Sequence, residues 1–176
     1  GNTVPNRFVS QVAFNPQNAN VLYVTLSGFD QGTPGKPGHV FKTVNALAAS
    51  PTWVNVSPPV NLPHNSIAID PSNPNIVYVG TDIGVWCSAD AGGSWTHMGP
   101  ASGMPNVAVF DLEIQPGTGK VFAFTHGRGA LMFEPSTAAV PPTITSFNPT
   151  NGPPLTTVTI RGTKLDEVTA VRFNNV

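Results

Sequence analysis

The side chains that could do chemistry lie in short polar stretches between apolar runs of the chain. Asp111 and Glu113 alternate with apolar residues inside one of these apolar runs, and Asp82 directly follows another. Pairs of carboxylates supply the general acid and base in the hydrolysis of sugar bonds, so Asp111 and Asp82 are the candidate catalytic residues. Candidates for holding a ligand by charge or hydrogen bonds are His64, Asp82, His126 and Arg128.

Each acidic candidate also has a structural interpretation, which the sequence favours. Asp111 and Glu113 could line a solvated channel instead of forming an acid and base pair. Asp82 precedes Ile83-Gly84 and has the position of a turn residue. Asp30 lies in a Gly-rich insertion, where we expect solvent around its carboxylate.

The basic candidates and the cysteine are similarly ambiguous. Arg128 lies in a Gly-rich turn, where it could tie loops together through carbonyl or carboxylate oxygens. His64 stands in a Pro-rich joint, where we expect it to be solvent-exposed. Cys87 is the single cysteine and lies on an alternating apolar run, which predicts a buried, inert thiol. The sequence therefore predicts no metal site and no cofactor.

Composition narrows the class of protein. Only 10% of the 176 residues are charged, the net charge is −1, and Gly and Pro together number 36 (17 and 19). The few basic residues are scattered, which argues against a nucleic-acid partner or an anionic membrane surface. No apolar run approaches the roughly 20 residues of a membrane span. Hydrophobic residues make up 40% of the chain, enough to form a folded core.

The elements that must position these residues are short strands. Runs of four to six residues rich in Val, Ile, Phe and Thr recur between Pro, Gly, Asn and Asp, and helical periodicity is nearly absent. Three stretches align with each other, beginning at Val9, Asn65 and Phe110. In each, a strand ends in an apolar residue, a polar residue and proline, at Pro16, Pro71 and Pro116.

The repeats continue beyond the prolines in parallel. Second strands follow at 21–25, 76–81 and 120–125, and third strands start at a glycine, at 38–42, 84–88 and 129–133. A fourth strand led by tryptophan is predicted at 53–56 and 95–98, but the third copy lacks one. Four-stranded units of about 45 residues predict β-propeller blades; generic β-sandwich patterning is the alternative. The predicted fold class is all-β: C-terminal blades of a β-propeller over 8–134, two full and one lacking its outer strand.

One turn carries a motif. Ser88, Asp90, Gly92 and Trp95 match the pattern S-x-D-x-G-x-x-W. We expect Asp90 to accept backbone N–H groups across the turn, and Gly92 and Gly93 to take positive φ. Trp95 is expected to close the hairpin over its own blade.

With its surrounding strands, this motif resembles the Asp-box (BNR) propeller repeat. Sialidases, xyloglucanase-type glycoside hydrolases, sortilin-type receptors and photosystem assembly factors share that repeat. The resemblance implies a propeller and says almost nothing about function. Sialidases use an arginine triad, and here only Arg128 lies in a suitable loop, so that activity has no support.

A second module is expected after a Pro-rich linker at 135–141. The stretch 142–152, with 156–163 and 170–173, is similar to the opening of an IPT/TIG domain, an immunoglobulin-like sandwich. Residues 142–176 are too few for a complete sandwich of roughly 100 residues, so we expect this partial domain to be truncated.

Topology assigns each loop to one end of the blades. In an up-and-down blade, the turns after strands one and three lie at one end, which we call the turn face. The opposite end, the loop face, holds the loops at 28–38, 57–65, 81–84, 99–106 and 125–128. Propeller enzymes of this resemblance work on the loop face, where His64, Asp82, Asp111, His126 and Arg128 are expected.

Two functions remain open at this point. The favoured one is a non-catalytic binding or scaffold part of a secreted or cell-surface bacterial protein, recognising polysaccharide or a surface protein. The alternative is a glycoside hydrolase, xyloglucanase-like, whose other carboxylates lie in missing upstream blades. No complete pair of facing carboxylates is evident, so we lean against an enzyme.

The third blade also predicts a partner. Its last strand, 130–133, ends before Pro135, which cannot donate to a ladder. We expect this edge, carrying Leu131 and Phe133, to pair with a strand from outside its own blade. That strand could be 3–7, missing blades of the same polypeptide or a neighbouring subunit; alternatively, Pro135 and the linker cover the edge.

Overall fold

The computed structural model describes residues 4–134, 143–153 and 155–163 and divides the chain into two units, Gly1–Ala138 and Ala139–Val176. Within the described residues the fold is all-β, and helix is limited to two short 3-10 turns, η1 (Asp30–Gly32) and η2 (Pro100–Ser102). The linker predicted at 135–141 and the strand predicted at 170–173 lie outside the described residues.

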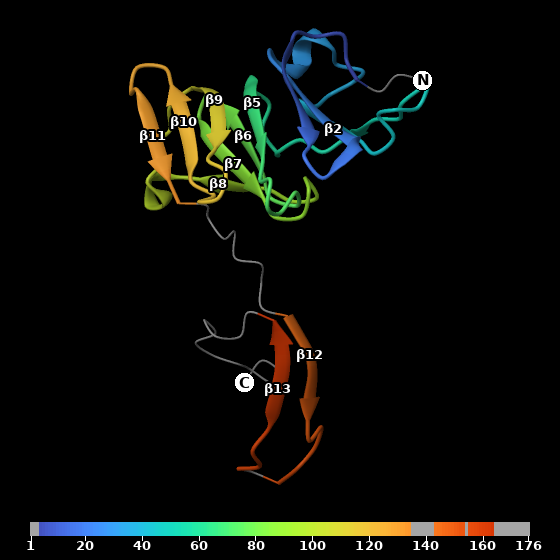
Figure 1. Ribbon diagram of the computed structural model, residues 1–176, viewed down its shortest axis with the longest axis vertical. Helices are drawn as coiled ribbons and strands as arrows, with labels where there is room; N and C mark the ends of the chain where they lie inside the picture. The colour runs from blue at the N-terminus through green and yellow to red at the C-terminus, as the bar shows by residue number, and fades with distance from the viewer. Residues whose placement is uncertain (1–3, 135–142, 154, 164–176) are drawn as a thin grey trace. The chain divides into compact units, whose positions relative to one another are not determined.

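The first unit is a series of three antiparallel sheets, which Figure 1 shows in sequence from blue to orange. Each sheet has its strands in chain order, as an up-and-down blade requires. The strands of blade 1 are β1 (Val9–Asn15), β2 (Asn18–Leu26), β3 (Val40–Thr43) and β4 (Val54–Asn55). Those of blade 2 are β5 (His64–Ile69), β6 (Val77–Thr81), β7 (Gly84–Ser88) and β8 (Thr96–Met98). Blade 3 has β9 (Val109–Ile114), β10 (Val121–Thr125) and β11 (Ala130–Phe133).

The predicted blades are therefore confirmed, but neither fourth strand begins at its tryptophan: β8 starts at Thr96, after Trp95, and blade 1 differs more. Its fourth strand is only two residues long and excludes Trp53. Ser57 explains part of this, because its hydroxyl oxygen accepts the backbone N–H groups of His39 and Val40 at 2.7 and 2.9 Å. A side chain takes the place of a strand partner there.

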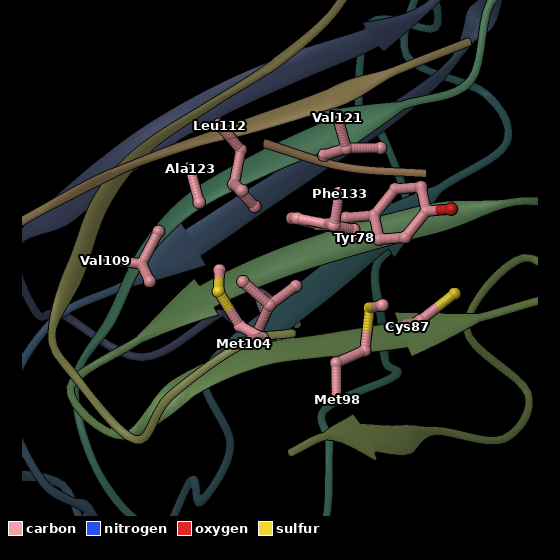
Figure 2. Packing of buried hydrophobic residues seen from close by; sticks show 10 residues of the cluster. Tyr78, Cys87, Met98, Met104, Val109, Leu112, Val121, Ala123 and Phe133 are labelled. Carbon is pink, nitrogen blue, oxygen red and sulfur yellow. The ribbon is translucent and has the colours of Figure 1, made fainter. Parts of the chain in front are cut away.

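Apolar cores lie between the blades. Tyr23 and Val40 of blade 1 pack with Ile67, Val77 and Val79 of blade 2. Between blades 2 and 3 the buried side chains include Tyr78, Val109, Leu112, Val121 and Phe133, which Figure 2 shows from close by. Strands β1, β5 and β9 contact each other in turn, so the first strands of the three blades lie side by side.

Hydrogen bonds confirm the two ends of the blades. On the turn face, Ala91 N donates to Asn75 O at 2.8 Å and Gln17 Nε2 to Pro71 O at 3.0 Å. On the loop face, Asn65 Nδ2 donates to Asp82 Oδ1 at 2.9 Å. The loops are thus grouped as the strand order predicts.

In the second unit, β12 (Thr143–Asn148) and β13 (Thr159–Thr163) form an antiparallel pair.

Candidate functional site

The turn between β7 and β8 holds itself together through Asp90. One carboxylate oxygen, Oδ1, accepts Ser88 Oγ–H and Ser94 N–H, each at 2.8 Å, while Oδ2 accepts Ser94 Oγ–H at 2.7 Å. Partial desolvation alone would raise the pKa of Asp90, but the hydrogen bonds from Ser94, Ser88 and Gly93 outweigh it and the pKa is lowered. Asp90 therefore acts as a charged acceptor inside the turn, with its oxygens already occupied.

One expectation for this turn is wrong, and another is incomplete. Positive φ falls on Ala91 (59°) and Gly92 (94°), not on Gly93. Gly93 is needed for space instead, because a Cβ there would come 3.0 Å from Asp90 Oδ2. Trp95 does not only cover its own blade: its Nε1–H donates to Val56 O of blade 1 at 2.7 Å. The turn therefore joins neighbouring blades.

His64 is completely buried, so the expectation that it is solvent-exposed is wrong. Its ring stacks on His39 with centroids 4.8 Å apart and planes 9° from parallel. The Pro-rich joint does not leave His64 in solvent, because blade 1 covers it. The ring cannot reach a ligand on the loop face.

Asp30 is also less solvated than expected. Its carboxylate is 26% exposed, lies 3.4 Å from Arg7 and accepts Gly38 N–H at 2.8 Å. Its own N–H donates to Asn61 Oδ1 at 2.8 Å. These bonds close the insertion at 28–38 against the joint between blades. Sequence reasoning missed His39, Arg7 and Asn61 in this cluster, since no local motif surrounds any of them.

Asp82 and Asn65 form an exposed polar pair on the loop face of blade 2. Asp82 is exposed, as its turn position suggests, and Oδ1 accepts the amide of Asn65. The second carboxylate oxygen and the rest of the amide can bond to hydroxyl groups of a ligand.

Asp111 and Glu113 are both exposed, but the structure does not bring them into one pocket. Their partners directly across β10 are Phe124 and Phe122, and opposite residues of an antiparallel pair share a face. Leu112 faces the other way, into the core with blade 2. Glu113 helps to line a hollow of about 240 Å³ along β1, β5 and β9, whereas Asp111 does not. The two carboxylates therefore lie on the open face of blade 3.

His126 and Arg128 are exposed in the turn between β10 and β11. The His126 ring meets Phe110 edge-on, with centroids 5.9 Å apart, and Phe110 is 56% exposed. The backbone N–H of His126 donates to Ala108 O at 2.9 Å, which fixes the turn beside the start of β9. Phe110 was not among the predicted site residues, although its place beside Asp111 could have suggested it.

The described part of the chain offers no reactive thiol, metal cluster or membrane-spanning helix. Burial raises the pKa of the Cys87 thiol to about 11, and the side chain is 2% exposed, as expected for an inert cysteine. Within residues 4–134, 143–153 and 155–163, no three His, Cys, Asp or Glu side chains gather in a way that could hold a metal ion. None of the helices in those ranges is long and apolar enough to cross a membrane.

Comparisons with known proteins agree with this architecture. Residues 142–176 match the IPT/TIG domain family. No curated protein matches the chain.

Several solved structures resemble the chain. A GH74 enzyme from Niastella koreensis is 21% identical, with a TM-score of 0.51 over 69% of this chain and 21% of that one. The GH74 xyloglucanase from Xanthomonas campestris is 16% identical, with a TM-score of 0.55 over 72% and 22%. The extracellular domain of a hybrid two-component system from B. thetaiotaomicron is 12% identical, with a TM-score of 0.52 over 74% and 16%.

The chain spans between 16 and 22% of the length of these proteins. At such identities the likeness shows the fold alone. Together with the sheet topology, it establishes an all-β chain of propeller blades, followed by a segment that matches the IPT/TIG domain family.

Proposed function

We propose that the loop face of the blades binds polysaccharide without cleaving it, as part of a secreted or cell-surface bacterial protein. The observation that carries the proposal is the exposed Phe110 ring, held by His126 at the loop-face end of blade 3. An exposed aromatic ring offers a flat apolar surface to the C–H face of a sugar. Arg128 in the same turn can donate to sugar hydroxyl groups.

The polar pair on blade 2 extends this surface. Asn65 and Asp82 supply both donors and acceptors, as sugar hydroxyls require. One of the similar structures is named a xyloglucanase, which supports a β-glucan of the xyloglucan type as the first ligand to test. The same resemblance, with the contacts within the turn at 88–95, supports an Asp-box assignment for that turn.

A binding role is favoured because Glu113 lines the hollow along β1, β5 and β9 and Asp111 does not, so the two carboxylates do not share that hollow. Glycosidases need two carboxyl groups roughly 5 to 9.5 Å apart across the scissile bond. Asp82 is on another blade from Asp111, and Asp111 and Glu113 lie on the open face of blade 3. A glycoside hydrolase is the alternative, and it requires an additional carboxylate from outside the described residues.

Replacing Phe110 by alanine should weaken xyloglucan binding at least about fivefold, since truncating an interface anchor costs more than about 1 kcal/mol. Affinity electrophoresis or calorimetry with xyloglucan measures this. Phe14→Ala is the matched control, because Phe14 is 60% exposed but sits on β1 at the turn-face end. Equal losses in both variants, or no binding by the parent chain, would contradict the proposed loop-face site.

The hydrolase alternative has its own test. Release of reducing ends from xyloglucan by the parent chain, lost in Asp111→Asn, would replace the binding proposal with an enzymatic one. Xyloglucan binding by both proteins, with no release of reducing ends by either, would support the binding proposal.

We also propose that the open face of blade 3 packs against another blade, from the same polypeptide or a neighbouring subunit. Phe124 and Met132 on this face are 43% and 51% exposed. Among the described residues, β11 pairs only with β10. Residues 4–7 do not supply the missing strand, because Arg7 bonds to Gly38 of blade 1. Phe133, expected at the exposed edge, is instead buried against blade 2.

This open face predicts self-association of the 176-residue chain. Light scattering should show a mass that rises with concentration, and Phe124→Ser with Met132→Ser should reduce the rise because both remove exposed apolar area. A parent chain that stays monomeric at high concentration would refute the prediction.

A further inference from the structure

The stacked rings of His39 and His64 are the one buried histidine pair among the described residues, and neither group has a part in the proposed sugar site. His39 lies just before β3 in blade 1, and His64 begins β5 in blade 2. Their side chains are 1% and 0% exposed. The pair therefore lies between the two blades, below the loop face.

Hydrogen bonds assign one proton to each ring. His39 Nε2–H fits Asn61 Oδ1 at 3.2 Å, while Arg7 Nη1 points a donor at His39 Nδ1 from 3.4 Å. A second proton, on Nδ1, could reach Leu26 O at 3.4 Å but would meet the guanidinium of Arg7. The neutral form with the proton on Nε2 is therefore the one that these neighbours favour.

His64 has even less room for a second proton. Its Nδ1–H donates to Leu62 O at 2.8 Å, and Nε2 is buried with no hydrogen-bond partner among the described residues. Protonation at Nε2 would create a buried cation without an acceptor, which is strongly unfavourable.

The charged groups around the pair cannot compensate two further positive charges. Arg7 from the N-terminal segment and Asp30 from η1 face the pair, and Asp30 already forms an ion pair with Arg7. Asp30 Oδ1 is also 3.4 Å from His39 Nε2. Asp82 reaches only Asn65, the residue after His64. The Asp30 carboxylate would thus have to balance the charge of Arg7 and of both protonated histidine rings.

The same atoms hold the insertion at 28–38 in place. Arg7 donates to Gly38 O, and Gly38 N–H donates to Asp30. Asn61 Oδ1 accepts hydrogen bonds from both Asp30 N–H and His39 Nε2–H. The His39 ring therefore shares its neighbours Arg7, Asn61 and Asp30 with the bonds that close the insertion.

We propose that the His39–His64 stack is an acid-sensitive latch, whose protonation releases the insertion at 28–38 and the segment around Arg7 from the joint between blades 1 and 2. The proposal does not depend on sugar binding.

The direction of the pH effect follows from the two states. Burial and the Arg7 charge lower the pKa of His39, and burial lowers the pKa of His64 to about 3. In the released state each ring should titrate near 6.5. The closed state is thus fully favoured above about pH 6.5 and is lost progressively as the pH falls toward 3. At pH 4.5, His64 alone should raise the ratio of open to closed molecules about a hundredfold.

Hydrogen exchange of the full chain at pH 7.5 and 4.5, corrected for the intrinsic rates, tests the latch. We expect faster exchange at pH 4.5 in peptides covering 26–40 and 57–66, but not in 77–88 of β6 and β7. His39→Gln with His64→Gln should abolish the acid-dependent difference. His126→Gln, which changes an exposed histidine, should retain it.

Unchanged exchange in the parent chain at pH 4.5 would overturn the proposal, as would a double variant that still shows the full acid response. If the double variant does not fold, the parent chain still decides. NMR titration of the histidine Cε1 signals should then show His39 and His64 protonating together with the loss of protection at 26–40. Protonation of both rings near pH 6.5 with protection intact would overturn the latch.

Discussion

Replacing Phe133 by alanine is expected to lower the free energy of unfolding of the blade unit by about 3–5 kcal/mol. The neighbouring change, Met132→Ala, should alter it by no more than about 0.5 kcal/mol. The two residues are adjacent on β11 and point to opposite faces of the sheet. Phe133 is 6% exposed, whereas Met132 is 51% exposed.

The difference comes from what Phe133 touches. Its ring meets Tyr78 of blade 2 edge-on, with centroids 5.9 Å apart. Figure 2 shows the two side chains next to each other. Val121 lies opposite Phe133 across the ladder and belongs to the same core. Deleting the ring leaves a cavity between blades 2 and 3 that these side chains cannot fill without moving.

Urea unfolding followed by tryptophan fluorescence measures this prediction directly. All three tryptophans, Trp53, Trp86 and Trp95, lie in blades 1 and 2, so the signal reports on the blade unit. Equal losses for Phe133→Ala and Met132→Ala would show that β11 does not pack on blade 2 as described.

Strand order and the two blade ends could be predicted from the sequence because their causes are local. Pro16, Pro71 and Pro116 follow the first strands, and a glycine lies at or within two residues of the start of each third strand, so each copy marks its own boundaries. Strand alternation then places Leu112 in the core and Asp111 on the other side of the sheet. Alternation does not predict which face of the sheet packs against another blade.

The properties of the candidate site depended on residues far apart in the chain. His64 is buried because His39, in another blade, covers it. Asp30 is held by Arg7, and Trp95 bonds to Val56. Such contacts between residues far apart in the chain leave no periodic pattern near either partner, so the sequence indicates solvent exposure from Pro- and Gly-rich surroundings alone.

Gly80 is a position where a single added methyl group should be harmful. It lies in β6, buried between blades 2 and 3. A Cβ there would collide with the side chain of Ser66 and would come within 2.8 Å of Val109 Cγ1. Gly80→Ala is therefore expected to destabilise the blade unit by up to about 3 kcal/mol through overpacking.

Gly99→Ala is the matched control, since a Cβ at Gly99 meets no atom within 4 Å and its backbone is extended. It should leave stability within about 0.5 kcal/mol of the parent. Val109→Ala should cost less stability in the Gly80→Ala variant than in the parent, because the smaller side chain makes room for the new methyl. A coupling energy of about 0.5–3 kcal/mol is expected in the double-mutant cycle measured by urea unfolding. Strictly additive effects would mean that Gly80 and Val109 do not meet between the blades.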